Sequence, residues 1–483
     1  MKAIVIGGGL GGIATALRLS AAGWQVTVAE AGPAFGGKMN RWSEAGYTFD
    51  TGPSLVTMPH VFADLYRALG ERIEDHLTFV PVDPHAEYRF PDGTRIVCPA
   101  SVDQWKCMIR AIEPRDAQGF DKLHALGRNL YELSARTFFR RSPSARPSIS
   151  ELSALRYLPL RRGWGNYART VAGLFRSPYL RQIYNRYPTY VGSSPYLCPA
   201  TLLVIPYIEQ RFGAWYVRGG LYRVVASLVQ LASERGIALM ANSRVVEIER
   251  ARGRASGVRL ADGTRLAADA IVMNGDAATA PGLLGENPRP PDAASRSLSG
   301  FVLLLGVRSR PPGLGHHTVL FSSDYRAEFE DLFTRRAFPR DPTVYLSAPA
   351  ATDPSVAPPG GDAFFAMANA PADAAWWTGD RVEAAARKVR ERVAAAGIDL
   401  ASAEVCDVWH PARFASRYLA PGGAIYGTHS HGWRNAFLRT PNRSREVPGL
   451  YFAGGSSHPG GGTPTVLLSA KITAGLITSD ARA

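Results

Sequence analysis

The hydrophobic pattern at the start of the chain predicts a strand, a glycine-rich turn, a helix and a second strand. The apolar run at residues 3–6 is typical of a buried strand, and residues 25–29 predict the strand that follows. Between them, residues 13–22 favour a helix, which Gly23 ends. This order predicts an α/β unit with a parallel sheet, an arrangement that binds nucleotides. Because the first apolar run leads straight into glycines, we expect no signal peptide.

Three glycines follow the first predicted strand with G-x-G-x-x-G spacing. Gly7 permits a tight turn, Gly9 lets the backbone approach a pyrophosphate, and Gly12 allows close packing of helix on strand. The helix N-terminus then presents free N–H groups to the phosphates. Glu30 lies where a carboxylate can bind the ribose hydroxyls, and an acid there disfavours a 2′-phosphate. These residues predict a dinucleotide site and leave NAD and FAD open.

The middle of the chain has a different pattern. Residues 55–240 are mostly helical in pattern with proline breaks, and residues 88–94 predict a hairpin because Asp92-Gly93 favours a tight turn. Residues 185–220 are rich in aromatic side chains and proline, which is typical either of a plain core or of the lining of an apolar tunnel. Four later apolar runs predict an antiparallel sheet with an amphipathic helix at residues 382–395; the runs are residues 301–307, 343–347, 363–367 and 405–409.

The nucleotide-binding pattern returns in two later parts of the chain. Residues 243–248 and 270–274 predict further strands, and residues 450–455 end another strand at glycines. We therefore expect a discontinuous nucleotide-binding domain, formed by residues 1–80, 241–290 and 421–483. Residues 81–240 are expected to form a substrate-binding and helical region, and residues 291–420 the sheet of a substrate domain.

The composition is that of a globular protein with two or three interleaved subdomains. Of the 483 residues, 46% are apolar and 20% are charged. The longest apolar runs are far shorter than the about 20 residues that span a bilayer, so we expect no transmembrane helix. The cysteines are widely separated and form no CxxC pair, which argues against a disulfide framework or a zinc site and indicates a reducing cytosol; they are Cys98, Cys107, Cys198 and Cys406.

The formal net charge of +14 is unevenly distributed along the chain. From Arg136 to Arg186 there are eleven arginines, no lysine and one acid, Glu151, with large aromatic and aliphatic residues among them. This mixture is typical of a surface that binds an anionic membrane. A solvated basic helical subdomain with an aromatic core would have the same composition. A nucleic-acid surface would carry a similar charge, but no nucleic-acid motif accompanies it, so we expect no such partner.

Two further segments favour FAD over NAD. Gly36-Gly37-Lys38 follows soon after Glu30, and Gly52-Pro53-Ser54 follows in the run TFDTGPS. This arrangement resembles flavoprotein oxidoreductases of the amine oxidase and carotenoid desaturase superfamily. The resemblance implies that FAD is the cofactor and that both tripeptides belong to its site, with the first supporting the phosphates and approaching the flavin.

The C-terminal run GLYFAGGSSHPGGGTP is the most specific in the chain. It ends a strand at glycines, forms a rigid loop at residues 459–464 and leads into a helix. We expect the N-terminus of that helix to face the flavin, where its dipole stabilises negative charge on the cofactor. The residues assigned here to the cofactor site are Gly454, Gly455, Thr463, Pro464, Thr465 and Val466.

Together these segments resemble bacterial phytoene-desaturase-like carotenoid dehydrogenases over essentially the whole chain. The resemblance implies an α/β fold. In it, a Rossmann-type FAD-binding domain of the amine oxidase/GDI-like superfamily carries an inserted α+β substrate domain and a helical, membrane-facing subdomain. It also implies that Val245 contacts the adenine of FAD through its backbone. One departure is Ser469-Ala470-Lys471, where relatives usually have glycine in the middle; alanine there is expected to change helix packing more than chemistry.

Two segments resemble most the branch that acts on 1-hydroxy or 1-methoxy carotenoids and introduces a 3,4 double bond: NRYPTYVGSSPYLCPATLLVIPYIEQ and GGAIYGTHSHGWRNAFLRTPNRSR. The expected substrate is therefore a long acyclic polyene with a polar end group. Candidate partners for that group are His429, Ser430, His431 and Asn435. The alternatives are a phytoene desaturase, a polyene isomerase or saturase, a hydroxysqualene oxidoreductase, an amine oxidase and a non-enzymatic protein of the prenyl-escort type.

Dehydrogenation of this kind needs little acid–base chemistry. A C–H bond beside the polyene gives a hydride to the flavin, and the remaining cation is delocalised until a proton leaves the adjacent carbon. The protein contributes orientation and a dry site, so we assign no catalytic base; His458, beside the predicted flavin loop, is a candidate for a direct role. We expect oxygen or a quinone as terminal electron acceptor and no metal. We also expect a cytoplasmic enzyme, peripherally bound to the inner face of the cell membrane.

Overall fold

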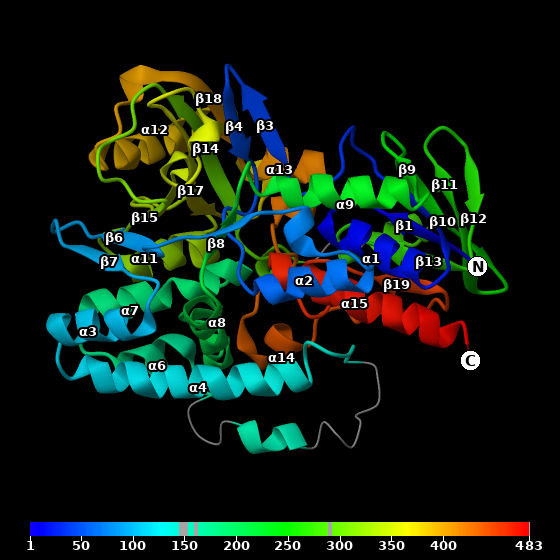
Figure 1. Cartoon of the computed structure of the whole chain (residues 1–483), viewed down its shortest axis with the longest axis horizontal. Coiled ribbons are helices and arrows are strands. Elements are labelled where there is room, and N and C mark those ends of the chain that lie inside the picture. The colour runs from blue at the N-terminus through cyan, green and yellow to red at the C-terminus, as the bar shows by residue number, and fades with distance from the viewer. Residues whose placement is uncertain (144–152, 159–162, 288–291, 483) are drawn as a thin grey trace.

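The computed structural model describes residues 1–143, 153–158, 163–287 and 292–482, and two large sheets form its framework (Figure 1). The first sheet has five strands in the order β19-β13-β1-β2-β9, and each neighbouring pair is parallel. The predicted strands at residues 3–6, 25–29 and 270–274 are confirmed. The strands are β1 (Lys2–Ile6), β2 (Gln25–Ala29), β9 (Ala238–Met240), β13 (Ala270–Met273) and β19 (Leu450–Phe452).

Both faces of this parallel sheet are buried, which explains why its strands are continuously apolar. Ala3 and Val5 pack on one face against four helices, whereas Ile4 and Ile6 pack on the other face against a small antiparallel sheet. The helices are α1 (Leu10–Ala21), α2 (Pro59–Ala68), α9 (Tyr222–Glu234) and α15 (Thr463–Asp480). The small sheet consists of β10 (Val245–Ala251), β11 (Arg254–Leu260) and β12 (Arg265–Ala267).

The second large sheet has seven strands in the order β18-β14-β17-β16-β15-β6-β7. The four apolar runs predicted as strands all belong to it, and so does the predicted hairpin at residues 88–94. Strand β15 joins that hairpin to the rest of the sheet because it pairs in parallel with β6, with Thr318 opposite Glu87. The strands are β6 (Ala86–Arg89), β7 (Arg95–Cys98), β14 (Ser299–Val307), β15 (His317–Leu320), β16 (Val344–Ser347), β17 (Asp362–Ala370) and β18 (Ala403–Trp409).

The two faces of the seven-stranded sheet have different neighbours. On the outer face, Leu303, Leu346 and Phe364 pack against α12 (Gly379–Ala395). The opposite face, which we call the inner face, carries Tyr88, Val319, Tyr345, Met367 and Val302 in one row across five neighbouring strands. Residues of this row pack against the helical part of the chain and against β4 (Tyr47–Asp50).

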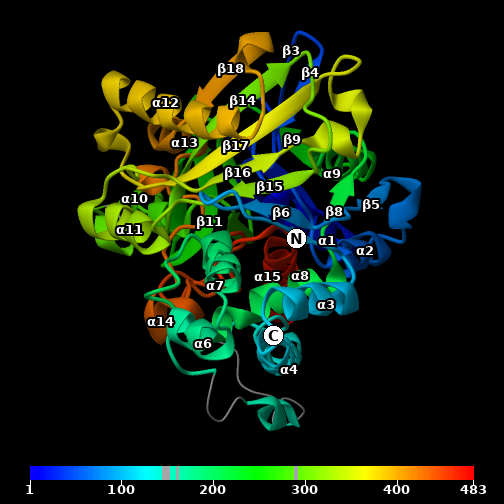
Figure 2. The ribbon, with the colours of Figure 1, turned by 90° about the vertical axis from the view of Figure 1, so that its left-hand side faces the viewer.

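A layer of helices lies beneath the seven-stranded sheet in both side views (Figure 1, Figure 2). Their buried positions are rich in aromatic residues, which pack with Tyr88 and Val319 of the sheet and with Phe90 just after β6. None of the helices in the described part of the chain has both the length and the apolarity needed to cross a bilayer. The helices of the layer are α3 (Val102–Ile112), α4 (Asp116–Arg136), α6 (Tyr167–Leu174), α7 (Pro178–Asn185) and α8 (Val204–Phe212).

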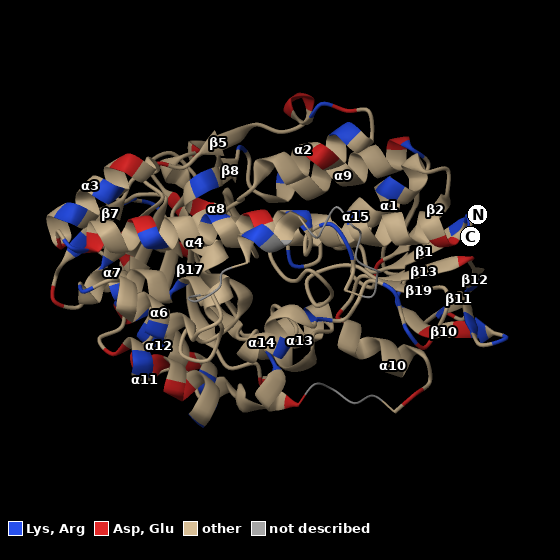
Figure 3. Cartoon of the chain, turned by 90° about the horizontal axis from the view of Figure 1, so that it is seen from below, with Lys and Arg blue, Asp and Glu red and all other residues tan. Residues whose placement is uncertain are grey.

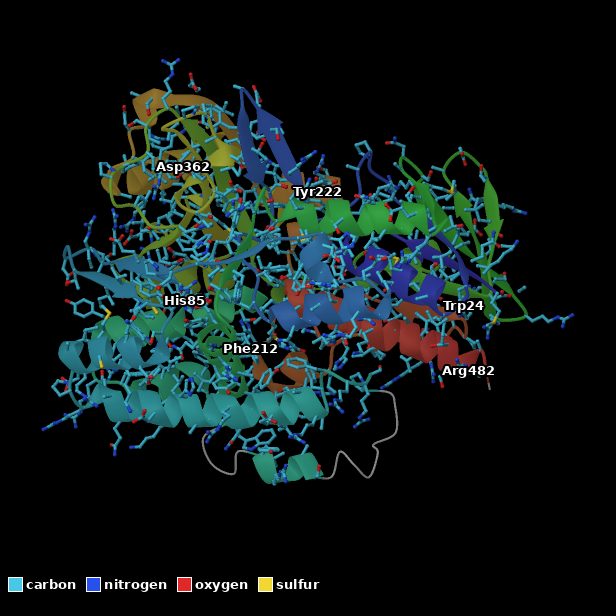
Figure 4. All side chains as sticks on the ribbon, viewed as in Figure 1. Trp24, His85, Phe212, Tyr222, Asp362 and Arg482 are labelled. Carbon is cyan, nitrogen blue, oxygen red and sulfur yellow. The ribbon has the colours of Figure 1, made fainter. Side chains whose placement is uncertain are left out.

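Asp50 ties β4 to the start of α9, between the two halves of the molecule. Its carboxylate accepts hydrogen bonds from the backbone N–H groups of Leu221 (2.8 Å) and Tyr222 (3.1 Å). Figure 4 shows Tyr222 at the inner end of α9, whereas Trp24 lies at the far end of the nucleotide-binding half. Burial raises the pKa of Asp50 to about 6, and the two backbone donors oppose this shift. The helix is therefore capped from a distant strand.

Asn442 connects β19, the loop after it and α15 in the interior. Its side chain is fully buried, and its amide donates to the carbonyl of His458 (2.8 Å) and to the hydroxyls of Ser469 (3.1 Å) and Thr473 (3.3 Å). Its own backbone carbonyl accepts from Phe452 of β19. Removing this side chain deletes several buried hydrogen bonds at once, and that is costly.

We expect Asn442→Ala to lower the free energy of unfolding by about 1–3 kcal/mol, because several buried groups each lose one of their hydrogen bonds. Denaturant titration followed by fluorescence measures the change. The matched control is Asn435→Ala at an exposed position of α14 (Gly432–Phe437), where the expected change is within about 0.5 kcal/mol. Equal destabilisation by the two substitutions would contradict the bridging role of Asn442.

Candidate functional site

The glycine turn after β1 leaves no room for side chains. Gly7 has a φ of +98°, and a Cβ added to Gly12 would lie 2.2 Å from the carbonyl oxygen of Gly7. Helix α1 begins at Leu10, and Gly9 caps it without a side-chain hydrogen bond. The N–H groups of its first turn are therefore not satisfied by a capping side chain. This is the arrangement in which a helix N-terminus binds phosphate.

The other predicted glycine segments meet this turn. The N–H of Gly36 donates to the carbonyl of Gly8 (2.8 Å), and a Cβ added to Gly37 would lie 3.1 Å from Cα of Gly9. A Cβ on Gly11 would lie 3.3 Å from Cα of Gly454 and 2.9 Å from Cγ1 of Val466. The structure thus brings residues 7–12, 36–37 and 454–466 together at the carboxyl ends of the parallel strands.

Asn274 lies at the centre of this convergence, and sequence reasoning missed it. Its amide donates to the carbonyl of Ala453 (2.8 Å), and its side-chain atoms are the nearest neighbours of a Cβ placed on Gly9 or Gly454. Its position directly after β13 could have indicated this role, because ligands of parallel sheets bind at the carboxyl edge of the strands. Asn274 therefore holds the turn after β19 against the glycine turn.

Glu30 stands at the end of β2 beside the glycine turn. One carboxylate oxygen accepts from the N–H of Gly8 (2.7 Å) and the other from the N–H of Gly32 (2.8 Å). The carbonyl of Glu30 accepts from the N–H of Ser243, two residues before Val245. Each carboxylate oxygen keeps a second lone pair for a ribose hydroxyl. The structure therefore places Val245 on the same side of the site as Glu30.

Lys38 connects the glycine segments to the C-terminal part of the chain. Its Nζ donates a hydrogen bond to the carbonyl of Ile425 (2.5 Å) and a longer one to the carbonyl of Ala424 (3.4 Å). Burial lowers the pKa of Lys38, and the negative charge of Asp276 opposes that shift. A Cβ on Gly52 would overlap the carbonyl oxygen of Lys38 at 1.8 Å, so only glycine fits there. The predicted residues 38 and 52 are therefore in direct contact.

The segment Gly52-Pro53-Ser54 leads from this site to the inner face of the seven-stranded sheet. The hydroxyl of Ser54 is 2.6 Å from the hydroxyl of Tyr345 on β16. Tyr345 is in turn 2.7 Å from Nδ1 of His317 on β15. Sequence reasoning missed both partners because they follow Ser54 by more than 250 residues.

The residues of this site fit FAD. FAD carries two phosphates, a ribose attached to adenine, and a flavin; N–H donors, a carboxylate and a positive helix end suit these groups in turn. Residues 7–12 would hold the phosphates, Glu30 the ribose, and Val245 the adenine. The N-terminus of α15, which Gly462 caps without a side-chain hydrogen bond, would face the flavin with Lys38 and residues 52–54. Thr463, Pro464, Thr465 and Val466 form its first turn.

Three of the four predicted substrate partners already use side-chain atoms in contacts within the protein. Burial lowers the pKa of His431 to about 3, and its Nε2 accepts from the N–H of Ser194 (3.0 Å). Nε2 of His429 is 2.9 Å from the carbonyl of Ala294, and the hydroxyl of Ser430 accepts from Arg439 (3.2 Å). Asn435 is exposed on α14. Their role as substrate partners stays a prediction.

His458 is buried beside the end of α4. Its Nε2 donates to the carbonyl of Phe138 (2.7 Å), and the two rings lie 4.4 Å apart. Burial lowers its pKa to about 4, so the imidazole is neutral near pH 7. These contacts give His458 a role in packing, and its direct role in chemistry stays a prediction. No cluster of metal-ligating side chains occurs among the residues that the structure describes.

Comparison with known proteins shows similarity along the whole chain. The family described as flavin-containing amine oxidoreductase matches residues 10–478. A 4,4′-diapolycopene oxygenase from Methylomonas sp. is 33% identical, over 99% of this chain and 98% of its own. A 1-hydroxycarotenoid 3,4-desaturase from Flavobacterium sp. (strain P99-3) is 33% identical over 99% of both chains. A variant of putrescine oxidase shares the fold, with a TM-score of 0.64 and 13% identity over 99% of both chains.

We expect Gly9→Val to abolish FAD retention, because a branched side chain would separate the backbone from the phosphates. The visible flavin absorbance of the purified protein, relative to protein concentration, measures this. Gly475→Val on the exposed side of α15 is the matched control, since a Cβ there meets no atom within 4 Å. The control should retain FAD. A Gly9→Val protein with one FAD per chain would contradict the site assignment.

Proposed function

This chain belongs to the flavin-containing amine oxidoreductase family, and we propose that it desaturates a long acyclic carotenoid. It is an FAD-dependent oxidoreductase. The observation that carries the choice of substrate is the full-length similarity to curated proteins whose names describe reactions on carotenoids. The apolar and aromatic residues of the inner face support it, because a polyene needs a mainly apolar site.

Within this class we propose that the substrate is a 1-hydroxy or 1-methoxy carotenoid and that the new double bond is the 3,4 bond. The support is the relative named for that reaction, together with the resemblance of residues 185–210 and 422–445 to the same branch. The alternative reaction is the desaturation of phytoene. The relative named as an oxygenase is equally similar, which makes the reaction type itself part of the test.

The residues of the chain orient the substrate and exclude water. When bound, FAD supplies the hydride acceptor for a C–H bond beside the polyene. Tyr345 and Met367, the partly exposed members of the inner-face row, present a mainly apolar wall, and fully buried neighbours such as Tyr88 and Val319 keep the site dry. The proton then leaves the adjacent carbon to water or a weak base, and we propose oxygen or a quinone as the final electron acceptor.

We further propose that the protein binds the inner face of the cell membrane from the cytoplasm. Apart from Met1, four large apolar side chains of the described residues are more than half exposed: Trp164 (55%), Leu197 (51%), Trp433 (62%) and Leu438 (57%). Their segments are neighbours, because the N–H of Gly432 donates to the carbonyl of Leu197 and the N–H of Ala200 to that of Gly165. An exposed apolar patch of this kind favours a membrane or protein contact.

Basic residues accompany this apolar patch. Arg169 and Arg434 are exposed on the same segments, and Arg140 is exposed just after α4. Arg161 and Arg162, also in the predicted basic segment, lie outside the described residues. On α4 itself, seen from below in Figure 3, basic and acidic residues are both present, so the excess of positive charge begins after this helix. Arginines beside apolar residues suit anionic lipid, and no nucleic-acid motif accompanies them.

We expect cells or liposomes supplied with hydroxyneurosporene to yield a product that has lost two hydrogens, with a lengthened chromophore. Mass spectrometry and absorbance measure both changes. A site that binds a hydroxyl discriminates by roughly 10⁴ or more against the analogue without it, so phytoene should react far more slowly. Efficient conversion of phytoene to lycopene would contradict the hydroxy-specific substrate, and a gain of oxygen would contradict desaturation.

We expect co-sedimentation with liposomes to require acidic lipid and to weaken as salt is added, because salt screens the arginines. The paired substitution Trp433→Ser with Leu438→Ser should weaken binding by removing apolar contacts, and Arg140→Glu with Arg434→Glu should weaken it by reversing charge. The matched control is Val97→Ser, an exposed apolar residue on β7. Binding to neutral liposomes at high salt that none of these changes alters would contradict the proposal.

A further inference from the structure

A short chain of hydrogen bonds crosses from the predicted FAD site to the sheet. Ser54, Tyr345 and His317 are linked by contacts of 2.6 and 2.7 Å between their side chains. The three residues come from the loop after β4, from β16 and from β15. None of them was singled out from the sequence for binding substrate, and Tyr345 is the central member.

Tyr345 stands next to the place where the flavin is expected. On one side, Ser54 belongs to the segment whose Gly52 touches Lys38. On the other side, Tyr345 pairs across the sheet with Met367. Gly300 on β14 lies close to both Met367 and Ile425, because a Cβ added to it would be 3.3 Å from Met367 and 3.5 Å from Ile425. The carbonyl of Ile425 accepts the hydrogen bond from Lys38. Tyr345 and Met367 therefore lie between the predicted cofactor contacts.

The exposure of these residues indicates open space in front of them. β16 and β17 are central strands, and their outer-face residues Val344, Leu346, Ala366 and Ala368 are fully buried. On the inner face, Tyr345 and Met367 are partly exposed. A central strand has accessible side chains on one face only if that face borders a space that solvent or a ligand can enter.

The hydroxyl of Tyr345 makes short contacts with Ser54 and His317, and Ser347 on the same strand also interacts with it. A phenol can donate once and accept twice, and Ser54 and His317 use two of these three positions. Burial raises the pKa of Tyr345 to about 12, so the hydroxyl keeps its proton at neutral pH. Burial also holds the pKa of His317 well below its usual range, so the imidazole is neutral. A neutral oxygen group of the substrate can therefore bind at the third position, in competition with Ser347.

On the basis of the proposed function, we propose that Tyr345 binds the oxygen of the substrate's end group and so sets its specificity. In a 1-hydroxy carotenoid, the oxygen is separated from the 3,4 bond by few carbons. A residue that binds this oxygen must therefore lie beside the hydride acceptor, as Tyr345 does. The side chains of the candidates at residues 429–431 already make hydrogen bonds with backbone groups and with Arg439. Ser54 and His317 act as positioning residues that fix the direction of the Tyr345 hydroxyl.

The central test is Tyr345→Phe, which removes the hydroxyl and keeps the ring. Two acyclic carotenoids of equal length and conjugation, with and without a 1-hydroxyl, are compared by kcat/KM and by Kd from fluorescence quenching. We expect the variant to lose about tenfold or more on the hydroxylated compound and to change less than about twofold on the other. FAD content, read from flavin absorbance, should equal that of the wild type.

Tyr325→Phe is the matched control. Tyr325 is also buried, and its hydroxyl has no hydrogen-bond partner among the described residues, so its removal should leave both values unchanged. Should Tyr345→Phe fail to fold with FAD, Ser54→Ala replaces it, with a smaller loss of the same preference expected.

The outcomes separate this inference from the proposed function. An equal loss by Tyr345→Phe on both carotenoids, or an unchanged preference, would overturn the role of Tyr345 while desaturation stands. If the wild type desaturates neither compound, the proposed function fails, and the Kd values still decide the inference. Tighter binding of the hydroxylated compound by the wild type but not by Tyr345→Phe supports it, and equal Kd values overturn it.

Discussion

The close approach of backbone segments around Asn274 is the constraint on which the rest of the structure depends. Gly12 packs on the carbonyl of Gly7, Gly37 on Gly9, and Gly11 on Gly454, each at a distance that excludes a side chain or forces a neighbour to shift. These contacts fix β1, β13 and β19 side by side and direct the N-termini of α1 and α15 toward one place. A side chain there would disturb the strands and the anion-binding ends of both helices, so binding and folding share the same residues.

The two faces of the seven-stranded sheet differ in the residues they carry, and each contributes to the site in its own way. Its outer face is closed by α12 with aliphatic residues, which gives a rigid support. Its inner face mixes aliphatic and aromatic side chains with a few polar groups, each held by a neighbour, as Tyr345 is by Ser54 and His317. Buried polar groups are tolerable only when they are paired, and the pairing fixes their direction. The sheet thus combines an apolar wall with a small number of oriented hydroxyl and imidazole groups.

The sequence predicted those features of the fold that depend on residues close together in the chain. The spacing of Gly7, Gly9 and Gly12, the acid at Glu30 and the continuous apolar strands predicted the parallel sheet and the segments that meet in it. Strand β15 was not predicted because His316, His317 and Thr318 interrupt the apolar pattern. Parallel pairing with β6 nevertheless makes this segment a strand. The contacts of Tyr345, Asn274 and His431 could not be predicted either, because the partners come from distant parts of the chain. A residue type indicates what a side chain can bind, but only the fold determines which neighbour uses it.

The order of the segments along the chain has a consequence for synthesis in the cell. The glycine turn at residues 7–12 leaves the ribosome first, yet Gly454 and the first turn of α15 are the last parts of the site to appear. While the chain is being made, the turn therefore lacks the elements that close it, and α1 lacks the helix against which it packs. Stable capture of the cofactor has to wait until nearly the whole polypeptide has been translated, so a nascent chain stalled before residue 454 would carry the nucleotide-binding motif without the complete site.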